Sequence, residues 1–191
     1  MLSAIIATHE SERTLVPTLA ALVPGATAGV LTEVVVADAD SADATAEVAD
    51  FAGCRFVVSR EPIGARLRAA AQTTRTPWLL FLRAGTVPDP NWVVVAEQFM
   101  LAASQQDEPR AAVFRPSSAN DPMRPALAEV FALLRMAFGR PARPEQGLLI
   151  TRRLYESVGG HAPHTEAETA LLRRLGRRRL AMLPIGARPP R

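Results

Sequence analysis

An apolar run from Val34 to Ala37 that stops at Asp38 constrains the fold of this chain more than any other feature. No polar residue alternates with the apolar ones, which is typical of a strand buried on both faces at the centre of a parallel sheet. In open α/β sheets, ligands bind outside the carboxyl ends of the strands. A carboxylate there can meet a ligand's hydroxyls or its metal, so Asp38 is a candidate binding residue.

Polar residues follow this run and lead into a helix that we predict over residues 42–52. Asp40, Ser41 and Asp43 allow two interpretations. They can contact a ligand at the strand end, or they can form turns and cap the helix, which is the commonest role of Ser and Asp at such positions.

Further apolar runs repeat the pattern of a strand followed by a helix. The order predicts an α/β fold with a mostly parallel sheet and right-handed connections. Pro24 and Gly25 are expected to end the first helix, and Asp89 followed by Pro90 to begin another. Predicted strands are 2–8, 55–59, 78–82, 111–115, 146–151 and 180–183; predicted helices are 64–74, 127–138, 152–158 and 165–175, with a loop over 116–125.

The length of 191 residues suits one domain, and no repeat or linker interrupts it. No apolar run reaches the roughly 18 residues of a membrane span. The N-terminus lacks the basic start of a signal peptide, so we expect a cytoplasmic protein. The single cysteine, Cys54, excludes an internal disulfide and a multi-cysteine metal site.

All 22 basic residues are arginine, which excludes a Schiff-base lysine. Residues 1–108 carry 7 Arg against 13 acidic residues, whereas residues 109–191 carry 15 Arg against 6. Such a split can indicate nucleic-acid binding. The arginines are spread over several predicted helices, and the single tyrosine and two tryptophans do not interleave with them, so we expect no nucleic-acid partner. A basic half that faces a ligand's phosphates or an anionic membrane surface fits equally well.

Four motifs, in order, resemble those of family 2 glycosyltransferases with the GT-A fold. The motifs are S-A-I-I-A-T-H-E at 3–10, V-V-V-A-D-A-D-S-A-D-A-T at 34–45, W-L-L-F-L-R-A-G-T at 78–86 and P-E-Q-G-L-L-I-T-R-R-L-Y-E-S-V-G-G at 144–160. The pattern is most similar to the compact subgroup found beside radical-SAM and selenium-related genes. The resemblance implies a single-domain, Rossmann-like three-layer α/β/α sandwich. It implies a nucleotide-binding half at 1–108 and an acceptor-side half at 109–185 containing Glu145 and Gln146; residues 186–191 should form a loose tail.

The resemblance also implies a nucleotide-diphospho-sugar donor, such as a UDP-sugar. By position, Thr8, His9 and Glu10 would line the base pocket, and Asp38 would meet the base or ribose, with Asp40 beside it. His9 could stack on a base or be a solvated turn residue. Arg66 and Arg68 could reach the diphosphate or simply lie on a solvated helix face.

Two expected motifs are degenerate. The family's metal-binding aspartate falls on Gly85, two residues after Arg83, and neither can ligate a divalent cation. We therefore expect no metal requirement, with Arg83 replacing part of the metal's charge. The resembled family has a Glu-Asp pair at the start of the late helix, and its aspartate is the general base. These two positions fall on His164 and Thr165 here, and the nearest acid is Glu166.

The same segment also allows a structural interpretation. Residues 165–168 match a capping box, with Thr165 as N-cap and Glu168 reaching back to the backbone. Glu166 and His164 are then the candidate catalytic bases. The leading hypothesis is a glycosyltransferase with an unknown acceptor. The alternatives are a non-catalytic binding or partner module and, less favoured, a nucleotidyltransferase, because the turn after the first strand lacks a glycine-rich loop.

Overall fold

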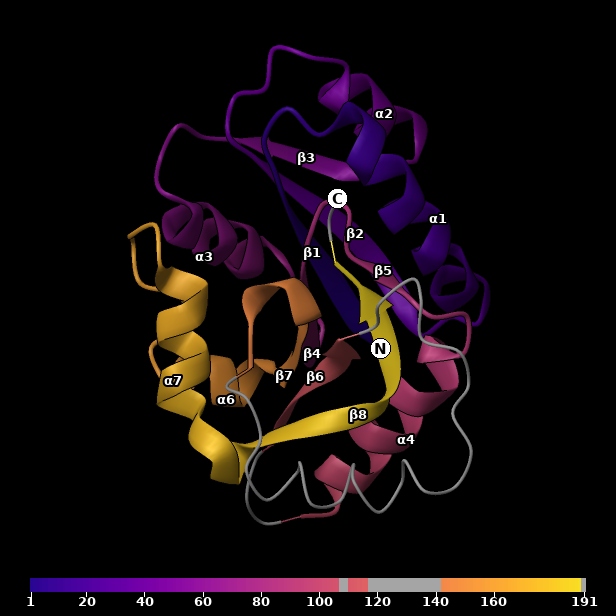
Figure 1. The fold of residues 1–191 in the computed structure, drawn as a ribbon, viewed down its shortest axis with the longest axis vertical. Coiled ribbons are helices and arrows are strands. Elements are labelled where there is room, and N and C mark those ends of the chain that lie inside the picture. The colour runs from indigo at the N-terminus through magenta and orange to yellow at the C-terminus, as the bar shows by residue number, and fades with distance from the viewer. Residues whose placement is uncertain (107–109, 117–141, 190–191) are drawn as a thin grey trace.

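In the computed structural model, which describes residues 1–106, 110–116 and 142–189, eight strands form one sheet in the order β3-β2-β1-β4-β7-β6-β8-β5 (Figure 1). The strands are β1 (Leu2–Thr8), β2 (Leu31–Asp38), β3 (Arg55–Val58), β4 (Trp78–Arg83), β5 (Val87–Pro88), β6 (Ala111–Pro116), β7 (Leu148–Thr151) and β8 (Leu180–Arg188). The helices are α1 (Glu12–Thr27), α2 (Thr45–Phe51), α3 (Ile63–Thr73), α4 (Trp92–Ser104), α6 (Arg152–Ser157) and α7 (Ala167–Arg179), with a 3-10 turn η1 (Pro144–Gln146). The predicted helix 127–138, and the loop before it apart from Pro116, lie outside the described residues.

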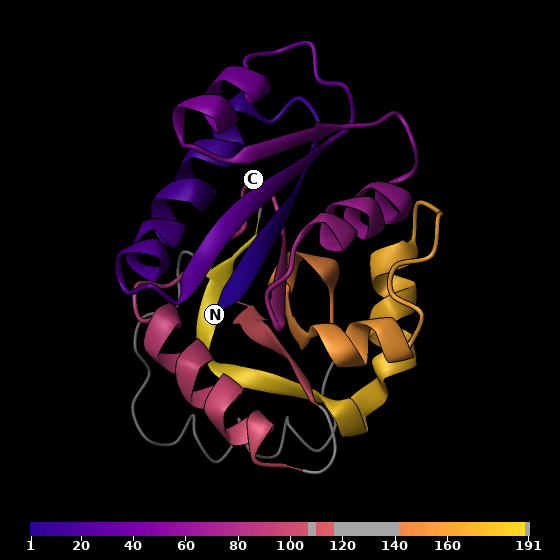
Figure 2. The same cartoon turned by 180° about the vertical axis from the view of Figure 1, so that it is seen from behind.

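Successive residues of the central strands point into two separate cores. Ile5 packs with α3, α6 and α7, whereas Ile6 packs with α1, α2 and α4. Figures 1 and 2 show these two groups of helices on opposite sides of the sheet. The predicted three-layer α/β/α sandwich is therefore confirmed, and it follows from strands that are apolar on both faces.

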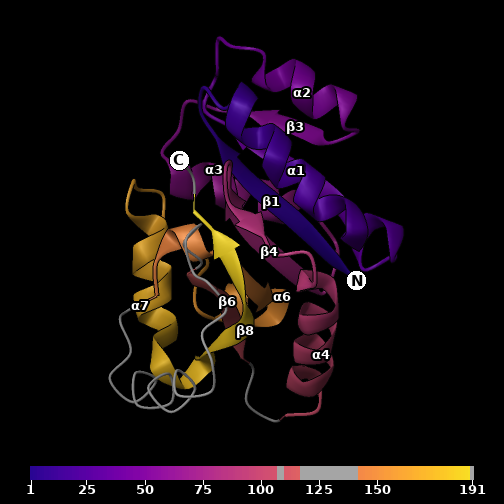
Figure 3. The ribbon, with the colours of Figure 1, turned by 45° about the vertical axis from the view of Figure 1, so that its right-hand side comes forward.

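The sheet is parallel in one half and mixed in the other. β3, β2, β1 and β4 pair in parallel, as the strand–helix repeats predict. β7 pairs antiparallel with both β4 and β6, while β8 runs parallel to β6 and antiparallel to β5. Figure 3 shows α4 and α7 on opposite sides of β6 and β8.

Strand order reverses at β1, because β2 and β3 lie on one side of it and β4 on the other. The register sets Thr8 beside Asp38 and Ala7 beside Arg83. The carboxyl ends of β1, β2 and β4 therefore meet at the kind of edge where open α/β sheets bind ligands.

The first helix does not end at Pro24 and Gly25, as the sequence predicts, but continues to Thr27. Gly25 is buried against α4, where an added Cβ would lie 2.6 Å from the ring of Trp92. The glycine thus permits close packing of two helices and is not a helix stop.

The prediction of a loose tail is wrong for residues 186–188, which belong to β8 and pair with β5 and β6. Asp89, the expected N-cap, anchors this end: its carboxylate accepts a hydrogen bond from the Gly186 backbone N–H at 3.1 Å. Asn91 takes the N-cap position of α4 instead. No helix among the described residues is long and apolar enough to cross a membrane.

Candidate functional site

The carboxylate of Asp38, only 1% exposed, lies at the carboxyl end of β2. One of its oxygens accepts hydrogen bonds from the Thr8 hydroxyl at 2.6 Å and the Ser41 hydroxyl at 2.7 Å. The other accepts the Ser41 backbone N–H at 2.6 Å. Burial by itself raises the pKa of Asp38, but these hydrogen bonds and the charge of Arg66 outweigh it and lower the pKa below its usual value. Asp38 is therefore a charged clamp between β1 and the loop after β2.

The loops after β1 and β2 are held together by Glu10. Its backbone N–H donates to the Ser41 hydroxyl at 2.8 Å, and its carboxylate accepts the Ala42 backbone N–H at 2.7 Å. Glu10 and Asp40 adopt φ values of 48° and 66°, and strained backbone of this kind clusters at binding sites. Four of the predicted nucleotide-binding residues thus gather at one edge, with His9 exposed beside them; the four are Thr8, Glu10, Asp38 and Asp40.

Turn and capping roles also account for the polar residues after Asp38. Asp43 accepts the backbone N–H of Thr45, the first residue of α2, at 3.0 Å. It also accepts the backbone N–H of Glu12, the first residue of α1, at 2.9 Å. Asp40 instead forms an exposed ion pair with Arg60 at 2.5 Å.

Arg66 fits neither interpretation that its sequence position suggests. It is 8% exposed, and its Nη1 donates to the backbone carbonyls of Thr8 at 3.0 Å and Ala37 at 2.6 Å. Burial lowers its pKa, against the opposing charges of Asp38 and Glu168. Arg66 thus holds the ends of β1 and β2 together, whereas Arg68, two residues on and on the opposite face of α3, is exposed.

Arg83, at the end of β4, points toward α7. Its Nε lies 3.2 and 3.0 Å from the two carboxylate oxygens of Glu168, and its Nη1 lies 3.6 Å from an oxygen of Glu145. The hydrogen bond to Glu168 raises the pKa of Arg83, although burial acts in the opposite direction. The positive charge of Arg83 is therefore held between the end of β4 and the start of α7.

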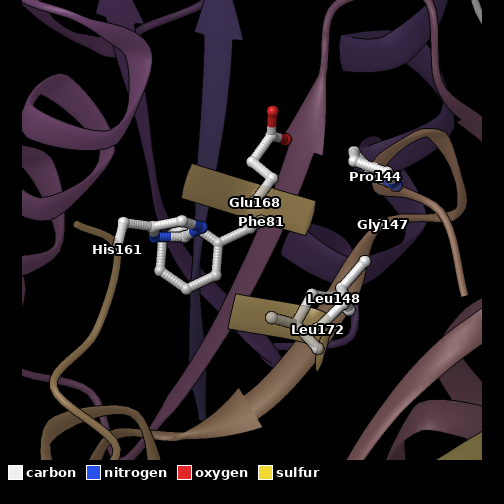
Figure 4. A pocket seen from close by; sticks show the side chains of 7 residues that line it. All are labelled: Phe81, Pro144, Gly147, Leu148, His161, Glu168 and Leu172. Carbon is white, nitrogen blue, oxygen red and sulfur yellow. The ribbon is translucent and has the colours of Figure 1, made fainter. Parts of the chain in front are cut away.

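A small pocket lies next to this ion pair, between β4, η1 and α7 (Figure 4). Its volume is about 10 Å³, room for about one water molecule. A sugar ring cannot enter it in this conformation. The lining residues are Phe81, Pro144, Gly147, Leu148, His161, Glu168 and Leu172.

His161 closes one side of the pocket, and its ring stands edge-on to Phe81 with 4.7 Å between centroids. Its Nδ1 lies 2.9 Å from the Tyr155 hydroxyl, which also accepts the His161 backbone N–H at 3.1 Å. Burial, with a smaller contribution from Arg174, lowers the pKa of His161 to about 3. The imidazole is therefore neutral and packs as part of the core.

The capping-box prediction for residues 165–168 is wrong. Glu166 holds the N-cap position of α7 without a side-chain hydrogen bond, and the Glu168 carboxylate pairs with Arg83 rather than with the backbone. His164 and Glu166 are both exposed, and neither lines the pocket. The acid that faces the pocket is Glu168.

Sequence reasoning missed Glu168 and His161 as members of this region. Gly176, at φ 64° and ψ 177°, is not helical and interrupts α7, in agreement with the predicted end of this helix at residue 175. His161 directly follows the matched motif at 144–160, which also contains the acceptor-side residues. That signal was available in the sequence.

Of the two acceptor-side residues, Glu145 pairs with Arg83 and Gln146 does not. Gln146 is buried, donates to the Phe114 backbone carbonyl at 2.6 Å and accepts the Arg143 backbone N–H at 2.8 Å. It braces η1 against β6.

The residues at the end of β4 do not fit a divalent cation. Gly85 has no side-chain ligand, and the two nearby carboxylates, Glu145 and Glu168, both face the positive charge of Arg83. Across the described part of the chain, no group of three or more His, Cys, Asp or Glu side chains could hold a metal ion.

Comparisons with known proteins agree with this architecture. Residues 3–121 match the model of glycosyl transferase family 2. No curated protein sequence matches the chain. Glucosyl-3-phosphoglycerate synthase from Mycobacterium tuberculosis is 21% identical, with a TM-score of 0.73 over 100% of this chain and 72% of that one. The same enzyme in complex with Mn²⁺, UDP and phosphoglyceric acid is 20% identical, with a TM-score of 0.70 over 95% and 67% of the two chains.

A further solved structure, described as a mycobacterial protein, is 23% identical with a TM-score of 0.71 over 96% of this chain and 64% of that one. At these identities the structural likeness shows the fold. The family match covers more than half of the sequence, so this chain belongs to glycosyl transferase family 2.

Proposed function

We propose that this protein is a glycosyltransferase that binds a nucleotide-diphospho-sugar at the carboxyl edge of β1, β2 and β4, without a metal ion. The observation that carries the proposal is the position of Arg83. Its guanidinium stands at the end of β4, beside the crevice, with the Glu168 carboxylate opposite. A guanidinium is a strong partner for a diphosphate, and a carboxylate can accept a proton from an acceptor hydroxyl.

The nucleoside would lie over the loops that follow β1 and β2. Thr8, His9 and Glu10 would line the base pocket, and Asp38 with Asp40 would position the base or ribose. The Asp38 oxygens already accept three hydrogen bonds within the protein, so its contribution includes holding the loop that receives the nucleoside. The diphosphate would then extend toward Arg83, with Arg68 at the cleft rim.

In the proposed reaction, the acceptor hydroxyl oxygen attacks the anomeric carbon of the donor. The bond from that carbon to the diphosphate oxygen breaks, and the nucleoside diphosphate leaves with the electron pair. Glu168 takes the hydroxyl proton, because its carboxylate lies beside Arg83, the group that would hold the diphosphate. Glu166 and His164 are the rival bases.

For the acceptor, an anionic molecule is the first class to test. The comparison enzyme is described with phosphoglyceric acid, and the second half of the present chain carries 15 Arg against 6 acidic residues. Membership of the compact subgroup beside radical-SAM and selenium-related genes, a cytoplasmic location and peripheral membrane contact stay predictions from the sequence.

A thermal-shift panel of UDP-, GDP-, TDP- and CDP-sugars, each in EDTA and in Mn²⁺, tests donor binding. A ligand at 100 times its Kd should stabilise the protein by about 2.7 kcal/mol. Donor consumption with phosphoglycerate present then tests transfer. Binding without consumption would favour the non-catalytic module, which the small volume of the pocket also favours. No shift with any donor would contradict the proposal.

A further inference from the structure

Every nitrogen of the Arg83 guanidinium faces a carboxylate. Nε and Nη2 both donate to Glu168, and Nη1 lies 3.6 Å from Glu145. The Glu168 side chain is 10% exposed and the Arg83 side chain 36%, so the pair is partly shielded from water. The Nε–Nη2 edge of the guanidinium is therefore taken by Glu168, and a phosphate that binds this edge must displace the carboxylate.

Glu168 is engaged just as fully. Both of its carboxylate oxygens accept hydrogen bonds from Arg83, at 3.2 and 3.0 Å from Nε. Both oxygens therefore spend part of their accepting capacity on Arg83 rather than on an acceptor hydroxyl. The ion pair also joins the end of β4 to α7, beside the pocket of about 10 Å³. One interaction therefore occupies both groups that the proposed function needs.

We propose that the Arg83–Glu168 ion pair is a latch that the donor's diphosphate opens. This inference rests on the proposed function. The diphosphate takes Arg83 from Glu168, and the freed carboxylate becomes available to the acceptor. Proton acceptance by Glu168 thus waits until a donor is bound, which limits reaction of the donor before the site is complete.

The latch has a thermodynamic consequence that binding alone can measure. A ligand shifts an equilibrium only through its different affinity for the two states, so opening the pair uses part of the diphosphate's binding free energy. Removing the negative charge of Glu168 releases Arg83, so the binding free energy that was used to open the ion pair should then add to the affinity for the diphosphate. The Glu168→Gln variant should therefore bind UDP more tightly than the wild type.

The experiment is calorimetric titration of UDP in EDTA and low salt, with folding checked by circular dichroism. Glu168→Gln should tighten UDP binding about fivefold, the equivalent of about 1 kcal/mol for a partly exposed pair. Glu97→Gln is the control, because it removes the same charge from an exposed position on α4, and it should change affinity by less than about twofold. Glu145→Gln should give a smaller gain in the same direction and serves if Glu168→Gln does not fold.

A second comparison isolates the pair. In an Arg83→Gln background, adding Glu168→Gln should leave UDP affinity unchanged, because no guanidinium remains to be released. If the wild type binds UDP and Glu168→Gln binds equally or more weakly, the latch is overturned and the proposed function stands. If no variant binds any nucleoside diphosphate, the proposed function fails and the latch fails with it.

Discussion

Asp38 ends β2 and Arg83 ends β4, on either side of β1. Their charges are nevertheless stabilised by different kinds of partner. Asp38 is 1% exposed and is held by hydroxyl and backbone donors from the two adjoining loops. Arg83 is partly exposed and is held by carboxylates from α7 and η1, at least 62 residues away in sequence.

The difference indicates that the two regions have different structural roles. Removing any donor from Asp38 leaves a buried charge without its partners, so this region is fixed. The ion pair between Arg83 and Glu168 is partly exposed. An anionic ligand can take the place of the Glu168 carboxylate on Arg83 with only a small loss of free energy. The first region shapes the site, and the second is able to change when a ligand binds.

The largest effect should come from the fixed region. Asp38→Ala leaves the Thr8 and Ser41 donors and the buried Arg66 charge without their partner. We expect the free energy of unfolding to fall by about 3 kcal/mol. Urea denaturation measures this, and Asp40→Ala, whose exposed partner is Arg60, should cost less than about 1 kcal/mol. Equal losses in the two variants would refute the distinction.

Lowering the pH should reduce the free energy of unfolding through two groups, His161 and Asp38, in different pH ranges. The pKa of His161 is about 3 in the folded protein, so the unfolded chain alone gains this proton as the pH falls below about 6.5. Stability should decline by about 1.4 kcal/mol per pH unit between about 6.5 and 3, or about 2 kcal/mol by pH 5. The lowered pKa of Asp38 means that its contribution is kept above about pH 4 and lost only below that.

Urea denaturation at pH 6.5, 5.5 and 4.5 separates these contributions. His161→Gln should flatten the decline in this range, because it removes the group that titrates. A decline that persists unchanged in His161→Gln would show that another group is responsible.

The smallest effect concerns the start of α7. Thr165 makes no capping hydrogen bond, so Thr165→Ala should change the free energy of unfolding by less than about 0.5 kcal/mol. A loss of about 1 kcal/mol would be the value typical of a working N-cap and would restore the capping box.

The sequence predicted the sheet well because its strongest signals are local. Apolar runs such as 34–37 and 78–82 have no polar face, so they could only be central strands, and the parallel arrangement then brings Thr8, Asp38 and Arg83 to one edge. The predicted strand 180–183 is too short, because β8 continues to Arg188. Its last residues pair with β5 and β6, and no local sequence pattern reveals these partners.

The site was harder to predict because its decisive contacts are long-range. Glu168 matched a local capping pattern, but its partner Arg83 lies 85 residues away. Arg66 was expected to reach the diphosphate or to lie on a solvated helix face, although it shares the inward face of α3 with Ala70, four residues on. The helical periodicity that places Arg66 on this face was visible in the sequence. The backbone carbonyls of Thr8 and Ala37, to which Arg66 donates, could not be predicted from it.

The proposed function has Arg83 bind the donor's diphosphate without a divalent cation, although the comparison enzyme is described in complex with Mn²⁺ and UDP. Calorimetric titration of UDP into wild-type protein and Arg83→Gln, each in EDTA and in millimolar Mn²⁺, tests it most directly. We predict equal affinity of the wild type in both buffers, and a loss of about tenfold in Arg83→Gln, the equivalent of about 1.4 kcal/mol. A large gain of the wild type with Mn²⁺, or unchanged affinity in Arg83→Gln, would contradict the account.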